Sequence, residues 1–265
     1  MTSINSSFSI FVSSSDSYSD IWDVFFDMFQ KFWPEYCGNI YLQTESLDYH
    51  HDGLNILCTK VGKHTAFGAT LRAGLDKVPN ENVLFIMIDY IFMGKVNHGK
   101  VIELYKYFVR NNLASLCLKH QNLPSYPCYD RLDVSHYMLS NHVFNYQIAF
   151  WKKGLLKKMA LPHENPWTSE WYGNKRALKA NLDIRTINEN AGDVFVYNAA
   201  GCLHRGKWMN DAVEFLKKLS YDIDYSERGL YEDDYKTFKT KFIIKKNMLL
   251  HGIKGSYWHR IKQTC

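Results

Sequence analysis

One acid directly follows the most apolar segment of the sequence. Residues 83–88 (Val-Leu-Phe-Ile-Met-Ile) are continuously apolar, and Asp89 and Tyr90 come next. Such a run predicts a strand in the middle of a parallel sheet, and open α/β sheets bind ligands beyond the carboxyl ends of their strands. An acid there can hold a divalent cation or a sugar hydroxyl. Position 91 is Ile91, so an Asp-x-Asp pair is missing, and the alternative is a carboxylate that only caps the next turn.

Two further acids, Glu164 and Glu170, flank a proline-fixed turn in Glu-Asn-Pro-Trp-Thr-Ser-Glu-Trp. A carboxylate can take the proton from an attacking hydroxyl, and the faces of Trp167 and Trp171 can stack on the C–H surface of a sugar. We therefore expect a catalytic base and an acceptor-binding surface here. The alternative is a helix start with Ser169 as N-cap, Glu170 in the first turn and buried tryptophans.

Three side chains that can carry positive charge lie within four positions: His204, Arg205 and Lys207. Gly201 and Gly206 beside them allow a close backbone approach. Fixed cations bind a diphosphate well and stabilise the charge that develops on it as it leaves. The alternative is an ordinary basic loop on the surface.

A fourth candidate is the polar loop that contains Ser14, Asp16 and Tyr18, directly after the short apolar segment 8–12. Small hydroxyl residues between a strand and a helix can donate hydrogen bonds to a nucleotide, and Asp16 can accept from a base or a ribose. Neither G-x-G-x-x-G nor G-x-x-x-x-G-K-[ST] occurs, which argues against the usual dinucleotide and P-loop sites. The alternative is a solvated loop with helix-capping residues.

Apolar periodicity predicts the elements that carry these residues. Strands are expected over 8–12, 39–44, 83–88, 146–151 and 193–197, and helices over 20–32, 69–77, 100–112, 169–180 and 209–219. Asp20 is the expected N-cap of the first helix. The strand–helix alternation is typical of an α/β fold with a Rossmann-like, mostly parallel central sheet.

The composition favours a protein of a reducing compartment. Its 265 residues are 46% hydrophobic and 15% aromatic, enough for a full core. The six cysteines are scattered and read as reduced thiols. We find no run of about 20 apolar residues that could cross a bilayer and no signal-peptide pattern at the start. The expectation is a cytoplasmic protein.

The charge is concentrated at the C-terminal end. From Lys236 onward there are eight Lys or Arg and no acid, so the preceding residues hold 24 bases and 27 acids, a balance of −3. We therefore divide the chain into a domain over 1–230 and a basic, amphipathic helical segment over 231–265. Attraction to anionic lipid predicts peripheral association with the cytoplasmic face of the inner membrane; the alternative is a solvated helical end.

Five segments in this order resemble a group of bacterial surface-polysaccharide glycosyltransferases with the GT-A nucleotide-sugar fold. They are 13–22, 83–90, 147–153, 164–170 and 205–208, within a resemblance that spans about residues 8–210. These enzymes make capsule, O-antigen and other lipopolysaccharide glycans. The resemblance implies transfer of a sugar from a nucleotide-sugar donor, with a UDP-sugar favoured, to a hydroxyl of a lipid-linked glycan.

The resemblance also implies roles for the candidate residues. Glu170 is the favoured base of an inverting direct displacement, with Glu164 as the other candidate and Asp89 in place of the Asp-x-Asp motif. Donor contacts are expected from Ser14, Asp16, Tyr18, Arg72, Asp89, Tyr90, His204, Arg205 and Lys207, and acceptor contacts from Trp167 and Trp171. Two alternatives follow from the single acid: Asp89 and His204 hold Mn²⁺ or Mg²⁺, or Arg205 and Lys207 replace the ion.

Two other classes of function compete with this interpretation. A catalytically inactive glycan-binding domain would keep the fold and the tryptophans. A nucleic-acid-binding protein would use the basic segment with its interleaved aromatic residues Phe242, Tyr257 and Trp258. The slightly acidic body and the lack of a nucleic-acid-binding motif argue against nucleic acid as a partner.

Overall fold

Strand β1 (Ser9–Ser13) is the strand around which the sheet is organised. It pairs in parallel with β2 (Asn39–Leu42) on one side and with β4 (Asn82–Met87) on the other. β3 (Asn55–Cys58) extends the sheet in parallel beyond β2. The order β3-β2-β1-β4 reverses direction between β1 and β4, as in one half of a Rossmann-like sheet. A ligand crevice is expected where the order reverses.

The other half of the sheet is mixed. β8 (Ala149–Lys152) runs antiparallel between β4 and β5 (Ser115–Cys117), and β9 (Ile184–Ile187) pairs in parallel with β5. β7 (Val134–Tyr137) and β6 (Ser125–Pro127) complete the order β3-β2-β1-β4-β8-β5-β9-β7-β6 by antiparallel pairing. Seven of these nine described strands point one way, and β7 and β8 oppose them.

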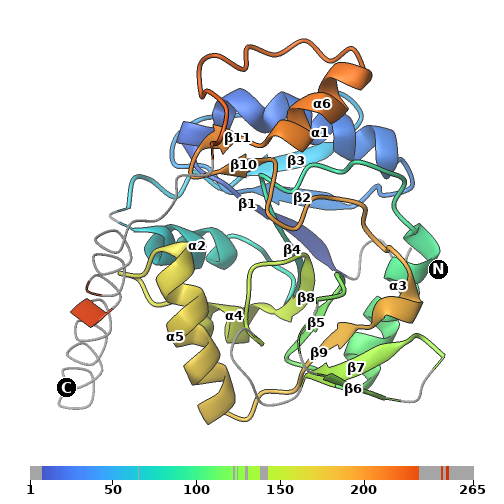
Figure 1. Ribbon diagram of the computed structural model, residues 1–265. Coiled ribbons are helices and arrows are strands. Elements are labelled where there is room, and N and C mark those ends of the chain that lie inside the picture. Colours follow the sequence, from blue (N-terminus) through green and yellow to red (C-terminus); the bar gives the residue numbers. More distant parts are fainter. Residues whose placement is uncertain are drawn as a thin grey trace.

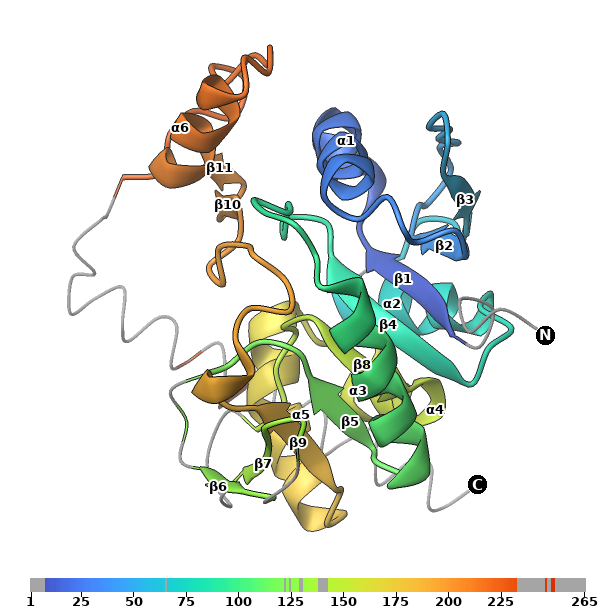
Figure 2. The ribbon, with the colours of Figure 1, turned by 90° about the vertical axis from the view of Figure 1, so that its right-hand side faces the viewer.

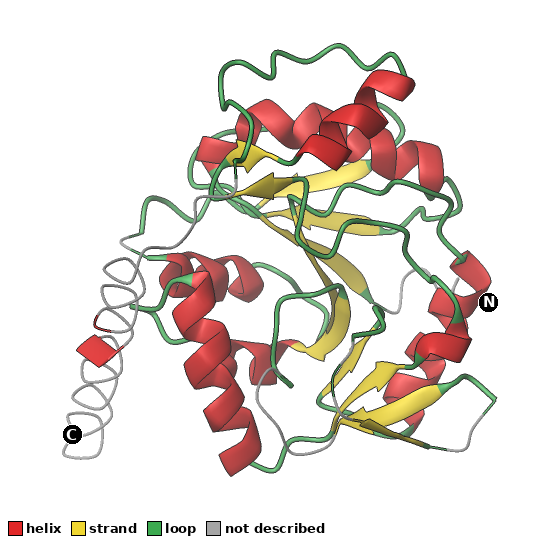
Figure 3. Ribbon diagram, in the orientation of Figure 1, coloured by secondary structure: helices red, strands yellow, loops and turns green. Residues whose placement is uncertain are grey.

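The computed structural model describes residues 8–64, 66–121, 123, 125–128, 131–137, 143–232, 246, 249 and 250. Helices cover both faces of the sheet (Figures 1 and 3). One layer holds α1 (Trp22–Phe32), α3 (His98–Arg110) and α6 (Asn210–Lys218), and the other holds α2 (Phe67–Asp76), α4 (Lys153–Met159) and α5 (Pro166–Lys179). The α/β fold class predicted from the sequence, with a mostly parallel, Rossmann-like central sheet, is confirmed.

Alternation along the strands divides the core between the two layers. Ile10 and Val12 belong to the cluster of α1, α3 and α6, whereas Phe11 between them belongs to the cluster of α2, α4 and α5. All three side chains are fully buried. Burial of each contributes about 1.5–3 kcal/mol, so the two-residue period of β1 stabilises both layers at once.

Helix α5 begins earlier than the sequence pattern predicts. The N-cap is Asn165, whose side chain accepts a hydrogen bond from the Thr168 N–H at 2.9 Å, and Pro166 occupies the first helical position. Ser169 is therefore not the N-cap. It is fully buried, with its hydroxyl 2.5 Å from that of Tyr146.

Two other local expectations were wrong. Residues 193–197 form a loop rather than a strand, because their backbone pairs with an irregular segment: the carbonyls of Val194 and Val196 accept from Asn97 and Met93. Asp20 is not the N-cap of α1, which starts after Ile21; its carboxylate forms an ion pair with Arg228 instead.

No helix of the described residues is long and apolar enough to cross a bilayer. Most of the predicted basic segment 231–265 lies outside the described residues. Of that segment, Lys246, Leu249 and Leu250 are helical and exposed. The division of the chain near residue 230 stays a prediction.

Candidate active site

The carboxyl ends of β1 and β4 lie side by side, and the candidate site is built from the segments that leave them. The N–H of Ile88 donates to the carbonyl of Ser13 at 3.0 Å, which holds the two ends together. The chain after β1 turns into a short 3-10 helix, η2 (Asp16–Ile21), and Asp89 is the second residue after β4. The structure thus puts Asp89 where the strand order reverses.

Asp89 is a half-buried residue whose carboxyl has one buried, unsatisfied oxygen. Its Oδ1 is shielded from solvent and has no hydrogen-bond partner among the described residues. Burial raises the pKa of Asp89 to about 7. An uncompensated polar group of this kind is costly in a folded protein, and strongly shifted carboxyls gather at functional sites.

The backbone of Gly201 packs against the Asp89 carboxyl. The N–H of Cys202 donates to the Asp89 carbonyl at 2.7 Å, which brings the Gly201 backbone against the carboxyl group. Gly201 has a φ of +84°, and a Cβ added there would lie 2.7 Å from Asp89 Oδ2. Both its conformation and its surroundings therefore require glycine.

A network of two tyrosines and a glutamine supports this loop. Gln147 Nε2 donates to the Tyr90 hydroxyl at 2.9 Å and to the Ala199 carbonyl at 3.0 Å. The Tyr197 hydroxyl donates to Gln147 Oε1 at 2.8 Å, and the two tyrosine rings lie 4.9 Å apart. Tyr90, predicted from its place after Asp89, thus positions the loop that carries Gly201. No sequence signal indicated Gln147 or Tyr197 as site residues.

Glu170 approaches the same place from α5. Its Oε1 accepts a hydrogen bond from the Tyr146 N–H at 2.9 Å, just before β8. Burial raises the pKa of Glu170, although that hydrogen bond lowers it in part. The pKa of Tyr90 is raised first by burial and then by the charges of Asp89 and Glu170.

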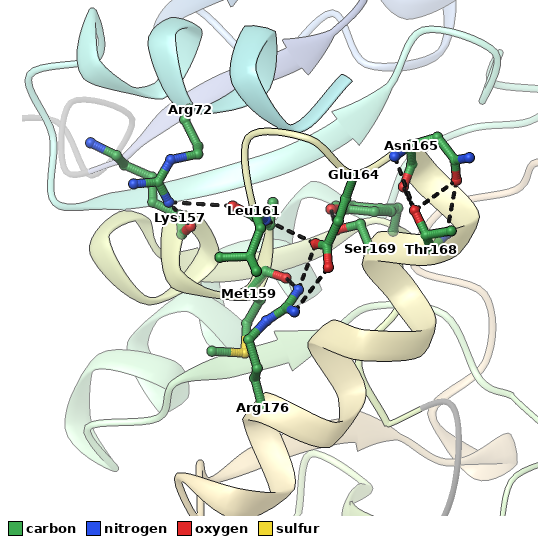
Figure 4. A network of polar contacts seen from close by, with 11 residues as sticks. Arg72, Lys157, Met159, Leu161, Glu164, Asn165, Thr168, Ser169 and Arg176 are labelled. Atoms are coloured by element: carbon green, nitrogen blue, oxygen red, sulfur yellow. Dashed lines mark hydrogen bonds and ion pairs between the residues drawn. The ribbon is translucent and has the colours of Figure 1, made fainter. Parts of the chain in front are cut away.

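Glu164, the alternative base, has a structural position (Figure 4). Its side chain is 2% exposed and accepts two hydrogen bonds from Arg176, at 2.9 and 2.6 Å, and one from the Leu161 N–H at 2.8 Å. Arg176 also donates to the Met159 carbonyl. A buried bidentate pair of this kind holds the connection of α4 and α5, and the role of Glu164 as a base stays a prediction.

Arg72 also points at this connection rather than at the crevice. It lies in α2 and donates to the carbonyls of Lys157 and Ala160, the latter at 3.3 Å, at the end of α4 (Figure 4). Satisfying terminal helix carbonyls is a common use of arginine. The structure therefore gives Arg72 a partner in α4, and its contact with a donor stays a prediction.

Asp16 and Ser14 shape the loop after β1. Asp16 accepts from the N–H groups of Glu45 and Ser46, at 2.8 and 2.9 Å, and from the Ser46 hydroxyl at 2.6 Å. Burial would raise the pKa of Asp16, but hydrogen bonds from Ser46, Glu45 and Leu47 outweigh it and lower the pKa. The Ser14 hydroxyl accepts from Trp22 Nε1 at 2.8 Å. Both side chains tie the loop down, and their contact with a nucleotide stays a prediction.

The basic cluster forms a two-stranded hairpin, β10 (Leu203–His204) and β11 (Lys207–Trp208). Arg205 and Gly206 between them have φ of 53° and 79°, as a two-residue type I′ turn requires. Arg205 and Lys207 are exposed at this turn. The hairpin starts two residues after Gly201, so its stem is fixed against Asp89.

Arg228 joins this hairpin to η2, and no sequence motif indicated it. Its guanidinium donates to the carbonyls of Ser17 at 2.9 Å and Gly206 at 3.3 Å, and it pairs with Asp20, 208 positions away. It also lies 5.0 Å from the ring centroid of Tyr18.

Tyr18 links this cluster to the buried carboxyl. Burial and the charge of Asp89 raise the pKa of Tyr18, while Arg228 lowers it in part. The structure thus brings together Tyr18, Asp89, Tyr90, Glu170 and the hairpin.

Trp167 and Trp171 face outward from α5. They are 62% and 37% exposed, so the alternative of buried, packing tryptophans was wrong. The Lys175 ammonium lies 5.2 Å from the Trp171 ring centroid. Glu170, one position before Trp171, is turned inward, so α5 carries a site residue and an exposed aromatic surface on different sides.

The described residues contain no group of three or more His, Cys, Asp or Glu side chains that could hold a metal. Asp89 could instead hold a metal together with the substrate, because Mg²⁺ commonly binds one or two carboxylates together with substrate phosphates and water. The free Oδ1 of Asp89 is suited to that role. The ring of His204 packs edge-on against Tyr231, with centroids 4.5 Å apart, and its part as a second ligand stays a prediction.

No known family model and no curated protein matches this sequence. Three similar solved structures have low identity. Residues 1–349 of TarS from S. aureus match with a TM-score of 0.49 and 13% identity, over 83% of this chain and 68% of that one. The mannosyltransferase PcManGT from Pyrobaculum calidifontis, in complex with GDP-Man and Mn²⁺, matches with 0.48 and 13%, over 76% and 58%. A UDP-glucose pyrophosphorylase complexed with UDP-glucose matches with 0.42 and 8%, over 73% and 92%.

The chain spans 41% of a longer TarS structure, which it matches with a TM-score of 0.47. Because all these TM-scores are below 0.5, they assign no activity to the chain. The function has to be argued from the site itself.

Proposed function

We propose that the chain is a glycosyltransferase that moves a sugar from a nucleotide-sugar donor to a hydroxyl of an acceptor glycan. The observation that supports this proposal most is that Asp89 has a buried, unpartnered oxygen where the strand order reverses. A second, half-buried carboxyl, Glu170, accepts from the N–H of Tyr146, the residue before the Gln147 that bonds Tyr90. Open α/β sheets bind nucleotides at this point. The two carboxyls have different surroundings, so they can have different tasks.

The donor would lie with its nucleotide against η2 and its diphosphate between Asp89 and the β10–β11 hairpin. Arg205 and Lys207 are exposed at the turn of that hairpin, where they can meet a diphosphate. They would stabilise the charge that grows on the leaving nucleoside diphosphate. A divalent cation, where bound, would be held by Asp89 and the phosphates and would neutralise part of the same charge.

Glu170 is the proposed base. The acceptor oxygen attacks the anomeric carbon, the bond from that carbon to the phosphate oxygen breaks, and the acceptor proton passes to Glu170. Attack from the side opposite the leaving group inverts the anomeric centre. The Tyr146 N–H fixes one carboxylate oxygen, and burial raises the pKa of Glu170 toward the range in which a carboxylate is an effective base.

The remaining assignments rest on the sequence. We propose a UDP-sugar as donor and, as acceptor, a lipid-linked bacterial surface glycan of the capsule or O-antigen kind, reached from the cytoplasmic face of the inner membrane. The basic segment after residue 235, with eight Lys or Arg and no acid, supports a membrane location.

The proposal is tested first by donor binding. Purified protein is heated with UDP-, GDP-, CMP- and dTDP-sugars, each with and without Mn²⁺ or Mg²⁺. We expect one nucleotide class to raise the Tm, since a ligand at about 100 times its Kd adds about 2.7 kcal/mol of stability. Stabilisation by glycans but by no nucleotide sugar would indicate a glycan-binding domain and contradict the proposal.

The base is tested with Glu170→Gln. Removing a general base costs about 10²–10⁴-fold in turnover, while donor-induced stabilisation should persist. The matched control is Glu214→Gln, the same change at an exposed position of α6, which should leave turnover unchanged. Near-normal turnover of Glu170→Gln would rule out its role as base.

A further inference from the structure

Helix α5 presents a stripe of two tryptophans and two lysines to solvent. Trp167, Trp171, Lys175 and Lys179 follow one another at intervals of four residues, so they lie on one side of the helix. All four are exposed, and we call them the Trp–Lys face. The two tryptophans occupy the first half of the helix, and the lysines occupy the second half.

The surroundings of this face are positively charged. Residues 151–180, which include α4 and α5, contain seven Lys or Arg and two acids. Both acids point inward: Glu164 is buried against Arg176, and Glu170 accepts from the Tyr146 N–H. Lys158 on α4 adds another exposed positive charge. On α2, the exposed Asp76 pairs with Lys157 of α4, whereas α4 and α5 themselves have no exposed acid. An exposed aromatic surface with bases on the same helix is complementary to an anionic layer.

We propose that the Trp–Lys face docks on the surface of an anionic lipid bilayer. Tryptophan is enriched at membrane–water interfaces, and each lysine close to an anionic surface adds to the attraction. Lysine stems can lie along apolar surface while the ammonium groups reach the headgroups. The chain continues into a segment with eight bases and no acid, whose described residues Leu249 and Leu250 are 65% and 46% exposed. Two basic, partly apolar surfaces of one chain therefore fit the same partner.

This arrangement would set the distance between the bilayer and the chemistry. Trp171 directly follows Glu170 in α5, and a helix with its side chains is about 10–12 Å across. A sugar linked to a lipid headgroup would therefore lie about one helix diameter from the proposed base. The use of the face for a lipid-linked acceptor rests on the proposed function, whereas docking itself is measurable without turnover.

Tryptophan fluorescence of the full chain tests the docking. Trp22, Trp33, Trp151 and Trp208 are fully buried, so a response to vesicles comes from Trp167, Trp171 or Trp258. In Trp258→Phe, the emission should shift to the blue on addition of phosphatidylglycerol-rich vesicles and should be quenched by brominated lipid. Adding Trp167→Phe and Trp171→Phe should abolish both changes. Absence of both signals in Trp258→Phe would overturn the proposal.

Vesicle flotation measures what the face contributes. Lys175→Gln with Lys179→Gln should weaken partitioning by about 30-fold at low salt, and Trp167→Ser with Trp171→Ser by at least about tenfold. The matched controls are Lys217→Gln with Lys218→Gln on α6, and Tyr126→Ser on β6, at equally exposed positions. Equal losses in test and control variants would indicate diffuse attraction and overturn the proposal.

Two further outcomes also decide against a bilayer. If light scattering shows self-association that the Trp167→Ser, Trp171→Ser variant abolishes, a second copy of the chain occupies the face. If soluble glycan, and not vesicles, quenches Trp167 and Trp171, the face binds an acceptor directly. Vesicle binding by a chain that shows no donor binding would leave docking intact and contradict only the proposed function.

Discussion

Asp89 and Asp16 lie at adjacent strand ends, but their carboxyls differ in hydrogen-bond partners and in the direction in which the pKa is shifted. Asp16 accepts hydrogen bonds from three residues of the neighbouring loop, which lower its pKa. Asp89 has a buried oxygen with no partner among the described residues, and burial raises its pKa. Both were candidates from the sequence because both follow a predicted strand. Only the structure separates them, because their partners come from residues 45–47 and 201–202.

The raised pKa of Asp89 predicts a pH-dependent stability. Between its ordinary pKa of 3.8 and the folded value of about 7, the native chain keeps a proton that the unfolded chain has lost, so stability falls as pH rises through this window. The full penalty is roughly 4 kcal/mol. Asp89→Asn removes this penalty. The Tm difference between this variant and the parent should therefore increase, in favour of the variant, from about pH 5 to about pH 8.

Asp16→Asn is the opposite control. Its folded pKa is lowered, so the carboxylate contributes stability above its ordinary pKa that is lost as pH falls. This variant should therefore be less stable than the parent at neutral pH, by a margin that shrinks on acidification. If Asp89→Asn showed the same trend, the carboxyl would not be buried as described.

Glu164 yields a prediction of a different kind. Glu164→Gln leaves Arg176 without its buried charge partner, and breaking such a pair costs about 3–5 kcal/mol. The Tm should fall by several degrees, while turnover per folded molecule should change less than twofold. Loss of turnover in a fully folded Glu164→Gln protein, measured beside Glu170→Gln, would show that the other carboxylate is the base.

At the scale of elements, the sequence predicted the first half of the fold well. The strands near 8–12, 39–44 and 83–88 and the helices around them are continuous local patterns, and each appears within a few residues of its expected place. The start of α5 was misplaced, although Asn165-Pro166 is a readable N-cap signal. The strand at 193–197 was wrong because buried side chains also occur in an irregular loop.

The loop that carries Gly201 offers a matched pair of glycine substitutions. Gly201 and Gly192 both have positive φ, at +84° and +66°, but a Cβ at Gly201 would lie 2.7 Å from Asp89 Oδ2, whereas nothing lies within 4 Å at Gly192. Gly201→Ala and Gly192→Ala therefore both strain the backbone, and Gly192→Ala does so severely because its ψ of 179° lies in a region that is essentially restricted to glycine. Only Gly201→Ala should also displace the Asp89 carboxyl and reduce donor binding, as measured by thermal shift. Equal donor binding by both variants would place the donor elsewhere.

At the scale of the whole molecule, segments far apart in sequence meet around the crevice. Figures 1 and 2 place α6 and the β10–β11 hairpin at the same end as α1, and Tyr221 after α6 donates to Asp27 of α1. The N–H of Trp208 donates to the Gly229 carbonyl at 2.9 Å, so the segment that leads to the basic end is attached to the hairpin. No local pattern encodes these pairings, or the insertion of β8 between β4 and β5, which explains why the sequence did not predict them.

Arg228 is the test of this long-range assembly. Arg228→Gln removes the partly buried bond to Gly206 and the exposed bonds to Ser17 and Asp20, and a hydrogen bond contributes about 1 kcal/mol. The Tm should fall and the KM for donor should rise, because the hairpin is no longer held against η2. Arg185→Gln is the control, since Arg185 lies in β9 and forms an ion pair with Asp183. It should lower the Tm without raising the KM for donor.

Asp89 is the residue on which the proposed function depends most, because we assign it to the nucleotide-sugar site of a glycosyltransferase. The most direct measurement is chromatography of the nucleoside diphosphate released from a panel of nucleotide sugars by the parent chain, Asp89→Asn and Glu214→Gln. We expect release from one nucleotide class by the parent and by Glu214→Gln, and a loss of about 10²-fold or more in Asp89→Asn. Release by Asp89→Asn at the parental rate, or pyrophosphate formation from a nucleoside triphosphate and a sugar phosphate in its place, would contradict this assignment.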